Sequence, residues 1–198
     1  FVKWKPMSDC IDLTTLDLPV AKHPTQIKNK KSLQPARIVR KKILSPIPLA
    51  PSKRSLLLDA MKMSLALKCR ETDPVTFADE EAVELFDMGG GLSIALVSMP
   101  KERRLSLESY IGFMAFGSGE PMAYGGGWIF GQRCRIGINV YPEFRHVGSA
   151  RLFCEVMRLY HQYFHVCNFV VRPNQFGKDN RDGLRSGAFW FYYKLGFR

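Results

Sequence analysis

The stretch from Val140 to Ala150 combines the end of an apolar strand with a turn suited to binding phosphate. It reads Val-Tyr-Pro-Glu-Phe-Arg-His-Val-Gly-Ser-Ala. Pro142 breaks the strand, and a helix is predicted to open at Gly148. The first backbone N–H groups of a helix have no partner within it, so they form a cradle for an anion such as a diphosphate.

Two features of this turn favour a phosphate ligand. Gly148 has no Cβ, so phosphate oxygens can approach the backbone closely. Arg145 brings a positive charge, Ala150 keeps the next turn narrow, and the Ser149 hydroxyl can donate a hydrogen bond. The candidate anion-binding residues are Val140, Arg145, His146, Val147, Gly148, Ser149 and Ala150.

A second motif lies at the end of the chain: Ala188-x-x-Phe191-Tyr192-x-Lys194-x-Gly196-Phe197. Together, the two motifs resemble the GCN5-related N-acetyltransferase (GNAT) superfamily. The turn resembles its acyl-CoA diphosphate loop, R/Q-x-x-G-x-G/A, and the second motif resembles a late helix of the family. The resemblance covers roughly residues 55–198. It implies an α/β (α+β) fold whose mixed, mostly antiparallel sheet has flanking helices.

The resemblance also implies a donor and a mechanism. Acetyl-CoA, or another acyl-CoA, would be the donor substrate, and no metal would be needed. Strands 134–141 and 167–172 would separate to admit the pantetheine arm. The backbone of Phe169, Val170 and Val171 would then line one side of the gap. Tyr192 matches the tyrosine that family members often use to protonate the departing CoA thiolate.

The general base stays open at this stage, because strand 134–141 offers no carboxylate. Glu108, and Tyr124 or Asn139 with a bound water, are the remaining candidates. Arg185 stands where the family usually has an Asn near CoA, so it either holds a phosphate or caps the helix. The chain ends at Arg198, where the family normally adds strands, so the last strands are expected to be absent.

Hydrophobic periodicity and turn residues predict the elements. Leu92–Met99 reads as a strand buried on both faces, and Ser109–Phe116 with Pro121–Ile129 as a hairpin. Gly125-Gly126-Gly127 in its second arm indicates a bulge or a close approach of another group. The remaining predicted elements are helices over 56–70, 79–86, 148–164 and 184–195 and strands over 134–141 and 167–172.

The composition of the chain limits the class of protein to which it can belong. The chain has 198 residues, is 46% hydrophobic and has no run of about 18 apolar residues that would indicate a membrane span. Its cysteines are scattered without a C-x-x-C pair, which favours reduced thiols in a cytoplasmic setting. Cys134 and Cys154 are predicted to be small core residues. The four histidines show no metal-site pattern, and a start at Phe1 suggests a processed chain or a fragment.

Charge divides the chain into two parts. Residues 1–54 are basic and Pro-rich and carry +9 of the formal net charge of +11. They are predicted to form an extended segment or linker before the acyltransferase domain at 55–198. Residues 22–42 could contact nucleic acid or an acidic partner, while a solvated linker is the plainer interpretation.

These observations predict an acyl-CoA-dependent N-acyltransferase that moves acyl groups other than aminoacyl groups to an amine. The acceptor could be a small molecule or a protein, and a homo-oligomer is one candidate assembly. Two alternatives stay open: a non-catalytic CoA-binding or scaffold domain, and a divergent enzyme that uses another activated donor such as aminoacyl-tRNA.

Overall fold

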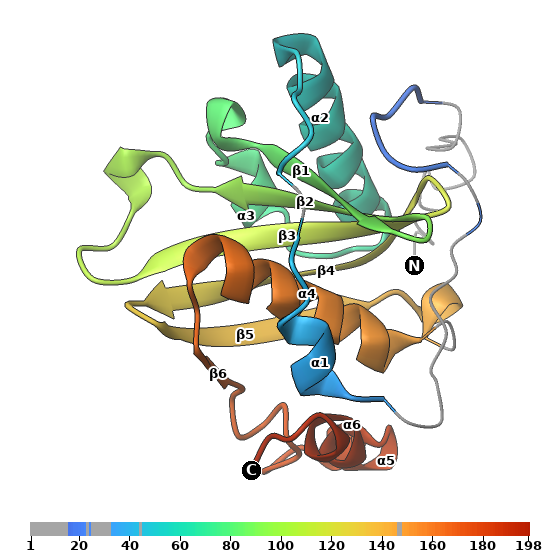
Figure 1. Ribbon diagram of the computed structural model, residues 1–198, viewed down its shortest axis with the longest axis vertical. Helices are drawn as coiled ribbons and strands as arrows, with labels where there is room; N and C mark the ends of the chain where they lie inside the picture. Colours follow the sequence, from blue (N-terminus) through green and yellow to red (C-terminus); the bar gives the residue numbers. More distant parts are fainter. Residues whose placement is uncertain (1–15, 23, 25–32, 44, 146–147) are drawn as a thin grey trace, which may run out of the picture.

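The protein is built on one six-stranded sheet. The computed structural model describes residues 16–22, 24, 33–43, 45–145 and 148–198. The strands lie in chain order, antiparallel through β5, and β6 then pairs parallel to β5 (Figure 1). This confirms the predicted mixed, mostly antiparallel sheet. The strands are β1 Glu84–Gly89, β2 Leu92–Ser98, β3 Ser109–Gly117, β4 Glu120–Phe130, β5 Arg133–Val140 and β6 Asn168–Val170.

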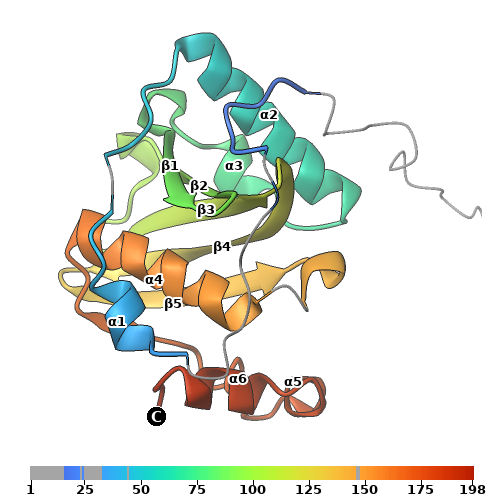
Figure 2. The same ribbon diagram turned by 45° about the vertical axis from the view of Figure 1, so that its right-hand side comes forward.

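Helices cover both faces of the sheet. The long helix α2 and the short helix α3 pack on one face, and α4 packs on the other with α1 outside it (Figures 1 and 2). Helices α5 and α6 lie beyond the β6 edge. The helices are α1 Pro35–Val39, α2 Pro51–Leu67, α3 Asp73–Thr76, α4 Ser149–Phe164, α5 Arg181–Arg185 and α6 Ala188–Lys194, with 3₁₀ turns η3 Glu80–Ala82, η4 Lys101–Arg103 and η5 Pro142–Phe144.

The core has two halves separated by the sheet. On the α2 side, Leu57 and Met61 belong to the same buried cluster as Met114. On the α4 side, Phe153 is buried in a cluster that includes Phe113. Strand β2 contributes to both halves, as its continuous apolar run predicts. Cys134 and Cys154 are fully buried, which confirms them as core residues.

The predicted helix over 79–86 is wrong. Asp79 caps only the three-residue turn η3, by accepting a hydrogen bond from the Glu81 N–H, and the chain then enters β1. Strand β1 pairs along its length with β2, and Ile47 bridges to Leu85 from the other side. The hairpin with β2 and the distant bridge from Ile47 satisfy the backbone of a segment whose local residues equally suit a helix.

The other predicted helices differ at their ends. Helix α2 begins at Pro51 and not at 56, because proline suits the first helical position. The closing helix is two helices, α5 and α6, separated at Gly187, which has a φ of 80°. Helix α4 begins after Gly148, as predicted.

The predicted β3–β4 hairpin is confirmed. Its two-residue turn, Ser118-Gly119, has positive φ at both positions, which matches the twist of paired strands. At Gly125-Gly126-Gly127 other side chains approach the backbone closely. There is no bulge at these glycines, since the β3–β4 register shift falls at Ala115 and Phe116. A Cβ on Gly126 would overlap the Tyr110 side chain.

The described part of residues 1–54 packs on the domain. Leu18 and Val20 are buried with α2, and the Ala21 N–H donates to Ser93 Oγ at 3.0 Å. Helix α1 lies against α4, where Gln162 Nε2 donates to the Val39 carbonyl at 3.3 Å. Among the helices of the described residues, none is both long and apolar enough to cross a bilayer.

Candidate functional site

The predicted anion-binding turn forms the start of α4. Gly148 is the N-cap residue with a φ of 86°, and the Leu152 N–H donates to its carbonyl at 2.9 Å. The N–H groups of the first helical turn therefore point out of the helix end. Arg145 is exposed beside them, and its carbonyl accepts the Ser149 hydroxyl at 2.7 Å. His146 and Val147, also predicted here, lie outside the described residues.

A gap between β5 and β6 opens on the same side of the molecule as this turn. The two strands pair at only three positions, and their register ends at Arg135 and Val170. Strand β5 continues to Val140, while the chain after β6 turns away toward α5 (Figure 1). The Gln175 side chain covers β5 beyond the end of this pairing, on the face that Gly137 presents to the small cavity: its Nε2 lies 2.7 Å from where a Cβ on Gly137 would be.

A small cavity of about 120 Å³ lies on the α2 face of the sheet. Tyr124 and Asn139 face each other across β4 and β5, and both line it. The Tyr124 hydroxyl donates to Glu71 Oε2 at 3.3 Å. Four of the cavity's lining residues are glycines, at positions 112, 125, 126 and 137, and the side chains of Tyr110 and Gln175 lie over Gly126 and Gly137. The cavity therefore brings together a carboxylate, phenols and an amide, from Glu71, Tyr110, Tyr124 and Asn139.

Burial and the Glu71 charge control the protonation of two phenols here. Burial, reinforced by Glu71, raises the pKa of Tyr124 to about 12. The same two causes, in the same order, raise the pKa of Tyr110 to about 12. Both phenols therefore keep their protons near neutral pH and act as hydrogen-bond donors. The carboxylate of Glu71 is the group that can accept a proton from a bound amine.

Sequence reasoning did not select Glu71. It follows α2 in the loop Arg70-Glu71-Thr72, where neither periodicity nor a motif distinguishes it from other exposed carboxylates. The pairing of β4 with β3 and β5, and the packing of α2 on that face, bring it to Tyr124. The three glycines at 125–127 predicted a bulge or a close approach of another group on β4, and gave no indication of Glu71.

The other predicted catalytic residues lie elsewhere. Glu108 lies just before β3 with its Oε2 3.9 Å from Arg135 Nη2. Tyr192 is 5% exposed and packs in an aromatic cluster, edge-on to Phe153 and stacked on Phe176. Burial raises the pKa of Tyr192. Its stacking partner Phe176 directly follows Gln175 in the chain.

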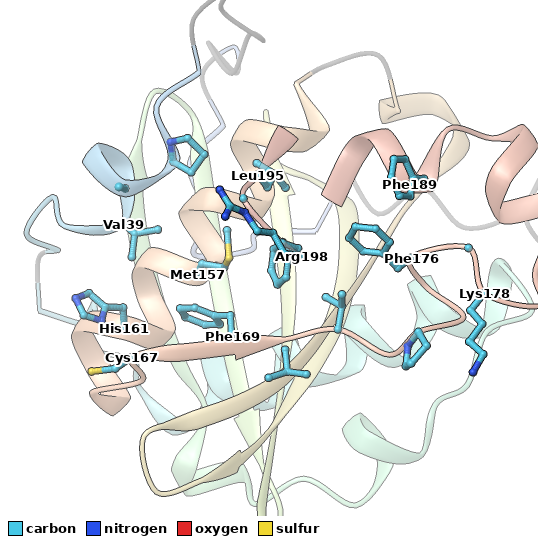
Figure 3. A pocket seen from close by; sticks show the side chains of 18 of the residues that line it. Val39, Met157, His161, Cys167, Phe169, Phe176, Lys178, Phe189, Leu195 and Arg198 are labelled. Carbon is cyan, nitrogen blue, oxygen red and sulfur yellow. The ribbon is translucent and has the colours of Figure 1, made fainter. Parts of the chain in front are cut away.

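A larger cavity, of about 940 Å³, lies on the outer side of β6. Figure 3 shows Met157, Phe169 and Leu195 gathered around it from α4, β6 and the end of α6. Val170 and Val171, predicted to supply backbone to the donor, line this cavity. Glu71, Tyr124 and Asn139 line the smaller cavity and not this one. Arg185 is exposed at the end of α5.

The described residues contain no cluster of three or more His, Cys, Asp or Glu side chains that could hold a metal ion. Comparisons of the chain with protein-family models, with curated proteins and with solved structures give no match. The resemblance carried by the two motifs thus remains a prediction.

Proposed function

We propose that the protein is an acyl-CoA-dependent N-acyltransferase that transfers an acyl group, typically acetyl, from a CoA thioester to an amine. The observation that carries the proposal is the early end of β5–β6 pairing beside the open N-terminus of α4. A gap in a sheet exposes unpaired backbone groups that can bind an extended, amide-containing ligand. The helix end adjoining it suits the diphosphate of the same ligand.

In this proposal the donor binds between β5 and β6. Its diphosphate is held by N–H groups at Gly148, Ser149 and Ala150, with Arg145 adding charge. Its pantetheine arm enters the gap over Gly137. Gln175 covers that position, so the arm either displaces the Gln175 side chain or hydrogen-bonds to its amide.

The acceptor amine binds in the small cavity. Its neutral nitrogen attacks the thioester carbonyl carbon, the C–N bond forms and the C–S bond breaks. Glu71 accepts the proton that the nitrogen loses, and Tyr124 and Asn139 orient the amine through hydrogen bonds. Tyr192 donates a proton to the sulfur, so that the products are an amide and the free thiol of CoA.

Binding of CoA tests the proposal most directly. We expect micromolar binding of acetyl-CoA to the full chain in calorimetry. Gly148→Glu should abolish this binding, because the new carboxylate would fill the diphosphate site and repel the diphosphate. The matched control is Gly89→Glu, since Gly89 has a φ of 81°, close to that of Gly148, in the β1–β2 turn with open space around it. Absence of CoA binding by the folded chain would overturn the proposal and favour a scaffold or another donor.

A second candidate function, binding to a polyanion, is favoured by one observation. Arg37, Arg40, Lys41 and Lys42 are all exposed on or after α1, whose apolar side packs on α4. Charge reversal at Arg37 and Arg40 should weaken binding to RNA or DNA and reduce its salt dependence. Unchanged binding would remove this candidate.

A further inference from the structure

A second chamber adjoins the small cavity. Its volume is about 390 Å³, which is within the range of small-molecule sites. Pro74 and Tyr110 border both spaces. The apolar lining residues are Pro74, Phe77, Met99, Leu105, Tyr110 and Trp128, and the charged ones are Asp73, Arg103 and Arg104.

Tyr110 is the partition between the two spaces. Its ring packs against Trp128, with 5.1 Å between ring centroids. Its hydroxyl end lies over Gly126, on the floor of the small cavity. A ligand with its amine at Glu71 and its ring at Trp128 would therefore lie along Tyr110, which borders both spaces.

The chamber leaves large apolar side chains open to solvent. Phe77 is 40% exposed and Leu105 is 59% exposed. The Arg103 guanidinium lies 4.0 Å from the Phe77 ring centroid and its arm shields one side of that ring. Grouped apolar side chains beside a polar cavity are typical of a site that takes the apolar part of a ligand.

Charge favours a cationic head group at the other end of that ligand. Glu71 faces the small cavity, and Asp73 lines the chamber close to Pro74. The phenols of Tyr110 and Tyr124 add only neutral donors and acceptors. In the chamber Arg103 and Arg104 outnumber Asp73, so the carboxylate that can receive a protonated amine is Glu71, in the small cavity.

We infer that the acceptor is an arylalkyl amine, with its aromatic ring in the chamber against Trp128 and Leu105 and its amine at Glu71 and Tyr124. The inference rests on the proposed acyl transfer for its reaction, but the binding geometry stands without it. An amine that lacks the ring leaves the chamber unfilled and binds more weakly.

The test compares 2-phenylethylamine with n-butylamine, which has the same charge and no ring. Each is titrated into the full chain by calorimetry without any acyl donor. We expect 2-phenylethylamine to bind at least about tenfold more tightly, because the chamber buries its ring. Leu105→Asn, at a position exposed enough to tolerate it, should remove most of that preference. Leu107→Asn is the matched control: Leu107 is 76% exposed and does not line the chamber.

The outcomes separate the two proposals. Equal affinity for both amines, binding of neither, or an equal effect of Leu105→Asn and Leu107→Asn would overturn the arylalkyl site. Selective binding without acyl transfer from acetyl-CoA would support the site and overturn the proposed function. Acyl transfer at equal kcat/KM to both amines would support the proposed function and overturn the arylalkyl site.

Discussion

The hydroxyl of Tyr110 lies directly over Gly126, so closely that a Cβ on Gly126 would overlap the phenol. The two residues belong to neighbouring strands, β3 and β4. The missing side chain at Gly126 is what allows the phenol to lie flat along the sheet. This contact sets the boundary between the small cavity and the aromatic chamber.

Gly126→Ala should destabilise the fold by about 1–3 kcal/mol, because the new methyl group forces Tyr110 out of position. In a Tyr110→Ala background the same substitution should cost much less, since the clashing ring is gone. Urea unfolding of the four proteins in this double-mutant cycle measures the coupling. Equal losses of stability in the two backgrounds would show that Tyr110 is not what makes alanine unfavourable at position 126.

Glu71→Gln should lower kcat about 100-fold in acetyl transfer while leaving acetyl-CoA affinity unchanged, because the amide cannot accept the proton. Glu81→Gln is the control, a carboxylate in η3 outside the cavity. Steady-state kinetics with a small amine and calorimetry with acetyl-CoA give the two readouts. A loss of donor affinity in Glu71→Gln would contradict its place on the acceptor side.

Tyr192→Phe should lower kcat about 100-fold, with little change in stability, if its hydroxyl protonates the CoA thiolate. The ring remains, so its packing on Phe153 and Phe176 is kept. Tyr193→Phe, at the next and 54% exposed position, is the matched control. Equal activity of both variants would reduce Tyr192 to a packing residue.

Removing Glu155 should cost more stability than removing Arg158. Both are buried, at 4% and 3% exposure, with Arg158 Nη1 2.8 Å from Glu155 Oε2. Glu155→Gln leaves the Arg158 charge buried without a counter-ion, at a cost of about 3–5 kcal/mol. Arg158→Met leaves Glu155 paired with Arg151 at 3.2 Å, so its cost should be smaller. Urea unfolding measures the loss of stability in both variants. A larger loss in Arg158→Met than in Glu155→Gln would exclude this explanation.

Stability should fall as pH rises from 10 to 12. The pKa values of Tyr110 and Tyr124 rise from the ordinary 10 to about 12 in the folded protein, mainly through burial. In that window the unfolded chain releases these protons first, so the folded state binds more protons and loses stability with increasing pH. Tyr110→Phe should make the decline shallower. Urea midpoints measured at pH 9, 10 and 11 test this, and a constant midpoint would contradict it.

Local patterns predicted the elements whose formation depends on near neighbours. The β3–β4 hairpin follows from its turn residues, and α4 from Gly148 and its amphipathic pattern. The segment after Asp79 shows the limit of this reasoning. Its residues suit a helix locally, and the pairing of β1 with β2 and Ile47 makes it a strand.

For the candidate site, the sequence alone predicted the turn at the start of α4 from its turn residues, and it named Tyr124 and Asn139 among several candidates for the base. Only the tertiary structure decided that these two residues face each other, that Glu71 joins them from the loop after α2, and that Tyr192 packs among aromatic rings. The physical reason is distance along the chain. Strand register and the packing of α2 on the sheet bring together residues whose local sequences carry no trace of that contact.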